Sequence, residues 1–106
     1  MKNEHTSMNK SFETIFTESE RDVIKFAVWH YMYEAVDRIN DICKIKPINE
    51  DNFIELDVCL DNIRDAVSIL IVFPGEEDYS YLTTKYTRKI EKVKRKFKEK
   101  QLDSEE

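Results

Sequence analysis

The stretch NFIELDVCLDNIRDAVSILIVFPG, residues 52–75, decides the fold because its apolar residues recur with a helical period. They follow one another in steps of three, four, three, four and three, a spacing typical of helices packed in bundles. These positions are Phe53, Leu56, Leu60, Ile63, Val67 and Leu70. Asn49 is a favourable N-cap before the stretch, and Pro74 with Gly75 ends it. The sequence therefore predicts a helix over residues 50–73.

The residues before this stretch predict another long helix. Thr17 and Glu20 are spaced as in a capping box, in which each side chain satisfies a free backbone N–H group of the first turn. The helix is predicted over residues 18–44, ending before Pro47. Its apolar residues recur every three or four positions and form one face. That face consists of Ile24, Val28, Tyr31, Ala35, Ile39 and Ile42.

A third helix is predicted over residues 76–102. Three acidic residues at its start suit the positive end of the helix dipole, and the many lysines in its last turns suit the negative end. Its apolar stripe consists of Tyr79, Leu82, Tyr86, Ile90, Val93 and Phe97. Helices joined by short loops run antiparallel in chain order. We therefore expect an all-α, antiparallel three-helix bundle within residues 12–102, flanked by a flexible tail at 1–11 and an acidic tail at 103–106.

Composition narrows the class of protein. One glycine and two prolines among 106 residues are too few for a turn-rich β protein. The polar N-terminus has no apolar segment of a secretory signal, and the longest apolar run, residues 66–73, is far below the roughly 20 needed to span a bilayer. We therefore expect a cytoplasmic protein without membrane contact. Cys43 and Cys59 should be free thiols, because folding the hairpin at residue 47 separates them by roughly 12 Å.

Charge is strongly segregated along the chain. Residues 85–100 hold nine of the 17 Lys and Arg and two acids, a net of +7 against −12 elsewhere. The basic strip consists of Lys85, Arg88, Lys89, Lys92, Arg95 and Lys96. An acidic ladder on the second helix consists of Glu50, Asp57, Asp61 and Asp65. Three interpretations remain open: the row of four lysines in the strip pairs with the ladder, both charged flanks are simply solvated, or the strip binds an external partner.

The first helix carries a second apolar stripe, made of Phe26, Trp29, Tyr33 and Val36. One interpretation is that the third helix covers this stripe. The other is that the stripe is an interface for a partner or for a homodimer, since Trp and Tyr are enriched at binding hot spots. The stripe of the third helix spans only about 80° on a wheel of 3.6 residues per turn. We therefore favour a homodimer through the first helix.

No catalytic or metal site is apparent. The chain has only two histidines, His5 and His30, and neither belongs to a metal-binding or catalytic motif. We therefore expect no enzyme and no cofactor. The pattern favours a small helical protein-binding regulator or inhibitor that acts stoichiometrically on another protein, as accessory proteins of phages and mobile elements often do.

Two alternatives involve nucleic acid. In the first, the basic C-terminal helix binds phosphates as a nucleic-acid-binding factor. In the second, the acidic ladder and the acids of the first helix imitate nucleic acid and block a nucleic-acid enzyme. Those acids of the first helix are Glu34, Asp37 and Asp41.

Overall fold

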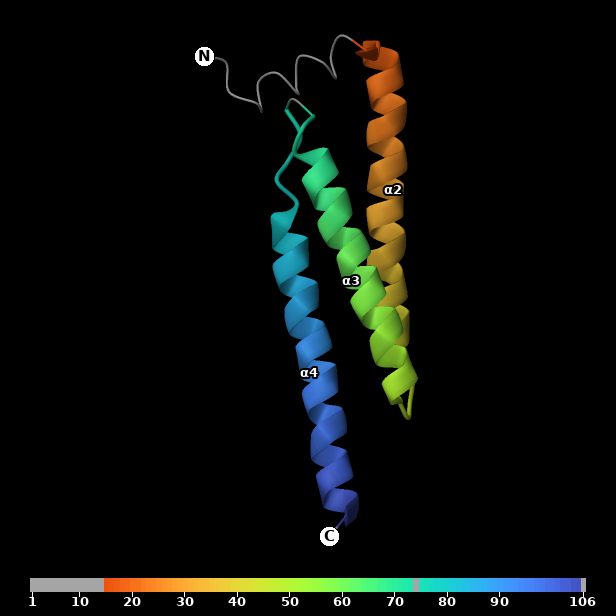
Figure 1. Ribbon diagram of the computed structural model, residues 1–106, viewed down its shortest axis with the longest axis vertical. Coiled ribbons are helices and arrows are strands. Elements are labelled where there is room, and N and C mark those ends of the chain that lie inside the picture. Colours follow the sequence, from red (N-terminus) through yellow and green to blue (C-terminus); the bar gives the residue numbers. More distant parts are fainter. Residues whose placement is uncertain (1–14, 74, 106) are drawn as a thin grey trace.

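The computed structural model describes residues 15–73 and 75–105, which form three long helices and no strand. They are α2 (Glu18–Ile42), α3 (Glu50–Leu70) and α4 (Ser80–Glu105). Consecutive helices run antiparallel, and α3 packs against both α2 and α4 (Figure 1). The predicted all-α antiparallel three-helix bundle is therefore confirmed. The predicted tail at residues 1–11 lies outside the described residues.

The starts of α2 and α3 are fixed by side chains that cap the backbone. At the start of α2, Glu20 N donates to Thr17 Oγ1 and Thr17 N donates to Glu20 Oε1, which completes the predicted capping box. At the start of α3, Asn49 accepts from the backbone of residues 51 and 52, and the Asn52 side chain reaches back to Asn49 N. These bonds satisfy donors that the first turn of a helix leaves free.

The helix ends differ from the predicted bounds by a few residues. α2 and α3 stop at Ile42 and Leu70, two and three residues early, because their last turns tighten into bonds between residues three apart, such as Lys44 N to Asp41 O and Phe73 N to Leu70 O. α4 starts four residues late, since the Asp78 carboxylate accepts a bond from Ser80 N and so caps the helix there.

The chain reverses between α3 and α4 at Gly75. Its φ of 76° lies in the left-handed region that favours glycine, and the loop runs from there to the start of α4. α4 then continues to Glu105, three residues past the predicted helix end at residue 102.

The core follows most of the predicted seams. On α3 and α4, the predicted seam residues are buried or pack against the buried cluster, except Phe97, which is half-buried against the Phe53 ring. On α2, Tyr31 is 47% exposed, so its placement in the core was wrong, and the neighbouring Met32 is fully buried instead. The physical reason is that α2 faces two helices at once, which turns its buried face toward Met32 and Val36. The buried residues of α2 are Met32, Ala35, Val36, Ile39 and Ile42.

α4 extends past the end of the hairpin formed by α2 and α3 (Figure 1). Phe97 of α4 meets Phe53 in the first turn of α3. The turns of α4 after Phe97 therefore lie beside the start of α3 and extend beyond it. The Cα radius of gyration is 18.4 Å, compared with about 13 Å for a compact chain of this length. The last turns of α4 therefore have fewer neighbours than the rest of the bundle.

Leu60→Ala should test the α3 seam. Leu60 is 7% exposed, so truncation should lower the free energy of unfolding in urea by about 2–5 kcal/mol. Ile71→Ala, at the exposed C-terminal end of the same helix, is the matched control and should change it by less than about 0.5 kcal/mol. A loss below about 1 kcal/mol for Leu60→Ala would mean that the seam is not the core.

Candidate functional site

Five aromatic side chains gather where α2 passes the start of α4, and we call them the aromatic cluster. The Trp29 and Tyr33 rings of α2 meet edge to face, with centroids 4.8 Å apart. The Tyr79 and Tyr81 rings at the start of α4 lie 6.5 Å apart. Edge-to-face ring pairs stabilise a packing arrangement beyond the area they bury. The members of the cluster are Phe26, Trp29, Tyr33, Tyr79 and Tyr81.

A polar link fixes the loop before α4 against α2 beside these rings. Lys25 Nζ lies 3.8 Å from Glu76 Oε2, and the Tyr79 hydroxyl donates to Glu76 Oε1 at 2.9 Å. Lys25 Nζ also lies 5.3 Å from the centre of the Phe26 ring. Together with Trp29, these residues line a small hollow of about 140 Å³. The link holds the rings of the two helices in one arrangement.

The surroundings of Tyr33 and Tyr79 favour the neutral form of both hydroxyls. Burial raises the pKa of Tyr33, and the neighbouring Tyr81 and Glu77 raise it further. Burial also raises the pKa of Tyr79, and so does its bond to the Glu76 carboxylate, while Trp29 partly opposes the rise. These hydroxyls therefore act as hydrogen-bonding groups near neutral pH and not as charges.

The structure divides the predicted apolar stripe of the first helix into covered and open parts. Val36 is 7% exposed and belongs to the core, so it offers a partner little surface. Tyr33 is half-buried, whereas Trp29 is 39% and Phe26 60% exposed. Tyr81 of α4 adjoins them and is also exposed. Sequence reasoning missed Tyr81, although its place two residues after Tyr79 sets it off the buried stripe of α4.

Among the described residues, no lysine of the row in the basic strip forms an ion pair with the acidic ladder. The link from α4 to the ladder is made instead by Lys94, whose Nζ lies 2.8 Å from Asp57 Oδ1. Arg64 of α3 itself reaches Asp61 at 3.4 Å. Lys94 lies on the side of the α4 stripe that faces α3, and the row lies on the other side or points outward.

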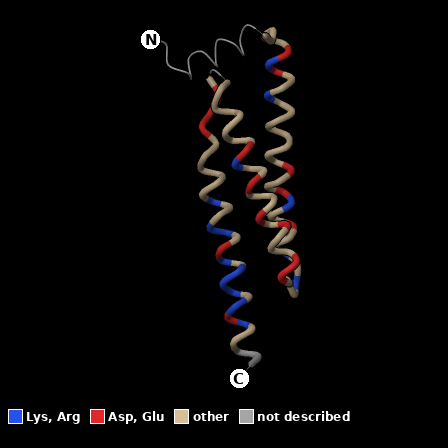
Figure 2. Tube along the Cα trace, viewed as in Figure 1, with Lys and Arg blue, Asp and Glu red and all other residues tan. Residues whose placement is uncertain are grey.

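Most of the basic strip has no described carboxylate as an ion-pair partner. Lys89 is committed to α2, because its Nζ donates to Asn40 Oδ1 while Asn40 Nδ2 lies 3.4 Å from the Tyr86 hydroxyl. Figure 2 shows the basic residues concentrated along the lower half of α4, with acidic residues on α3. The strip members without such a partner are Lys85, Arg88, Lys92, Arg95 and Lys96.

Other candidate chemistry finds little support among the described residues. His30 Nε2 lies 3.3 Å from Glu34 Oε1, but both side chains are largely exposed on α2. No three His, Cys, Asp or Glu side chains of the described part gather as metal ligands. Cys43 and Cys59 are free, as predicted, and burial raises the pKa of both thiols. No described helix has the length and apolar character needed to cross a membrane.

Comparisons of the chain with protein-family models, with curated proteins and with solved structures found no match.

Two substitutions to glutamate should separate the open part of the cluster from its packed base. Phe26→Glu should leave the free energy of unfolding nearly unchanged, because the ring is mostly in solvent. Trp29→Glu should lower it by about 1–3 kcal/mol, because it removes the packing against Tyr33 and places a second acid near Glu76. Urea denaturation followed by circular dichroism measures both. Equal losses of stability for the two variants would contradict this division.

Proposed function

We propose that this protein is a stoichiometric protein-binding regulator or inhibitor that contacts its partner through the aromatic cluster. One observation carries the proposal: Phe26, Trp29 and Tyr81 are exposed together over a packed base of Tyr33 and Tyr79. Single exposed apolar side chains are ordinary, but a group of aromatic rings is the composition of a binding hot spot.

The packing beneath these rings favours binding. A side chain that is free in solution loses rotamer entropy when a partner immobilises it, at about 0.5–1.5 kcal/mol each. Trp29 is already held by Tyr33, and the loop before α4 is held to α2 by Lys25 and Glu76. The open rings therefore lose less freedom on contact than rings on an unsupported surface.

The charge pattern supports a role in steering. The strip cations without a described carboxylate partner, together with the net charge of −5, give the molecule a strongly uneven field. Such a field raises association rates with a complementary partner and excludes others. The aromatic cluster supplies contact area, and the segregated charge supplies orientation.

The test uses a partner captured by the tagged protein from its native host and then purified. Isothermal titration should give one partner for each chain, and Phe26→Glu should weaken the affinity roughly 30-fold, the effect of losing about 2 kcal/mol at a hot spot. Val23→Glu, one turn earlier on α2 and similarly exposed, is the matched control and should bind as the wild type. Unchanged affinity for Phe26→Glu would contradict the proposal.

Nucleic-acid binding is the second candidate, favoured by the strip cations that have no described carboxylate partner. Changing Arg88, Lys92, Arg95 and Lys96 to Gln should then reduce the salt dependence of binding, with the slope falling by about 0.9 for each phosphate that is no longer neutralised. Fluorescence anisotropy with labelled single- and double-stranded oligonucleotides at 50–200 mM salt measures this. The candidate fails if wild type and variant bind alike.

The nucleic-acid mimic is less well supported by the geometry. Its acidic ladder would have to present a continuous row of free carboxylates. Asp57 is held by Lys94 and Asp61 by Arg64, and the exposed apolar residues Ile54 and Val58 interrupt the acids on α3.

A further inference from the structure

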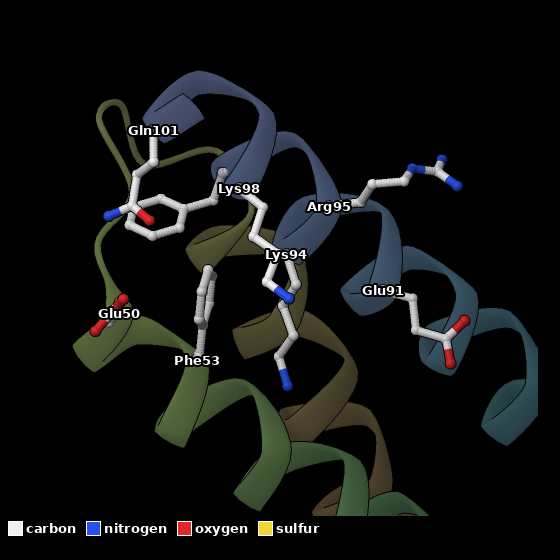
Figure 3. Close-up of a pocket in the computed structure, with 8 residues that line it drawn as sticks. Glu50, Phe53, Glu91, Lys94, Arg95, Lys98 and Gln101 are labelled. Atoms are coloured by element: carbon white, nitrogen blue, oxygen red, sulfur yellow. The ribbon is translucent and has the colours of Figure 1, made fainter. Parts of the chain in front are cut away.

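A groove runs between the start of α3 and the last turns of α4, away from the aromatic cluster. Its floor is apolar, because the Phe53 and Phe97 rings meet edge to face with centroids 5.2 Å apart. Figure 3 shows Phe53 pointing from α3 toward α4, between Glu50 and Lys94. The groove has a volume of about 580 Å³. Its lining residues are Glu50, Phe53, Glu91, Lys94, Arg95, Phe97, Lys98 and Gln101.

The rim of this groove on α4 is basic and only partly neutralised. Lys94 pairs with Asp57, but Arg95 and Lys98 form no ion pair with a described carboxylate. Beyond the groove, α4 continues past the start of α3 and exposes Leu102. An apolar floor with unneutralised cations at its edge fits an occupant that presents apolar side chains flanked by carboxylates.

The outer face of α3 has that chemistry. Ile54 and Val58, one turn apart, are both exposed, and Ile54 is 69% exposed. Asp51, Asp61 and Asp65 are exposed on the same side of this helix, within about 60° of these two residues at 100° per residue. Asp61 also lies 3.4 Å from Arg64 of the same helix, but an ion pair this exposed holds its carboxylate only weakly. Each chain therefore carries both a groove and a surface complementary to it, side by side. Two such surfaces on one chain can satisfy each other in a two-fold dimer, where each contact occurs twice.

We infer that this protein forms a two-fold dimer in which Ile54 and Val58 of each copy enter the groove of the other copy. The two α3 helices then cross antiparallel near these residues. In that orientation the α3 helix of the second copy runs along the last turns of the first copy's α4, beyond the residue at which the first copy's own α3 begins. Its Asp61 and Asp65 face Lys98 and the last turns of α4, and Lys94 keeps the Asp57 carboxylates neutralised near the axis.

This dimer differs from the one predicted through the first helix, and it does not use the aromatic cluster. It removes Ile54 and Val58 from water together with the Phe53 and Phe97 floor. It also gives Lys98 carboxylate partners that its own chain does not provide among the described residues. The aromatic clusters stay open, one on each copy, so a dimer would bind two partner molecules.

Charge reversal and mixing test the inference. Multi-angle light scattering at tens of micromolar should give twice the 12.7 kDa chain mass for the wild type. Arg95→Glu with Lys98→Glu makes both sides of the interface acidic, and Asp61→Lys with Asp65→Lys makes both sides basic. Each double variant should therefore be a monomer. An equal mixture should recover the dimer, because every contact then joins opposite charges.

Ile54→Glu tests the apolar part of the interface and has a close control. Ile71 is 66% exposed, nearly as much as Ile54, and lies just past the other end of α3. Ile54→Glu should give a folded monomer by circular dichroism, and Ile71→Glu should stay a dimer. A monomeric wild type, dimeric reversal variants or a mixture that stays monomeric would each overturn the inference. None of these outcomes changes the expected effect of Phe26→Glu on partner binding.

Discussion

The apolar seam of α3 is the constraint on which the rest of the structure depends. α3 packs along both other helices, whereas the described links between α2 and α4 are local, at Asn40 and at the aromatic cluster. Leu56 and Ile63 are completely buried, so α3 cannot rotate without exposing apolar area at roughly 25 cal/mol for each Å². The position of α3 therefore sets where α2 and α4 present their remaining faces.

Each candidate surface is a helix face that this arrangement leaves exposed. α2 turns its buried face toward Met32, which leaves Phe26 and Trp29 at the edge of the contact with α4. α4 extends past the end of the hairpin formed by α2 and α3 (Figure 1). Its last turns carry cations without described carboxylate partners and form one wall of the groove. The aromatic cluster and the groove lie at opposite ends of the bundle, and a partner and a second copy can therefore occupy them independently.

Local signals made most of the fold predictable from the sequence. Thr17 and Asn49 cap their helices through contacts within three residues, and the spacing of the α3 seam identifies its buried face without knowledge of its neighbours. The start of α4 was less predictable. Any of three consecutive acids could have preceded its first turn, and the observed start follows from the bond that Ser80 N donates to the Asp78 carboxylate.

The candidate sites depended on how the helices are rotated against one another, which the sequence pattern does not fix. A wheel places the lysine row at the edge of the α4 stripe, but it does not say which edge faces α3. The structure shows that Lys94 lies on that edge and that Lys89 faces Asn40 of α2. Burial of Tyr31 was mispredicted for a similar reason, since α2 meets two helices and its buried face lies between their directions.

Amide hydrogen exchange on the folded protein tests the central role of α3 most directly. Amides that open only when the whole molecule unfolds exchange last, and their opening free energy equals that of global unfolding. We expect the slowest amides to lie in α3 between Leu56 and Leu70, and those after Phe97 in α4 to exchange much sooner. If α2 or α4 kept its protection after the α3 amides had exchanged, α3 would not be the element that holds the bundle together.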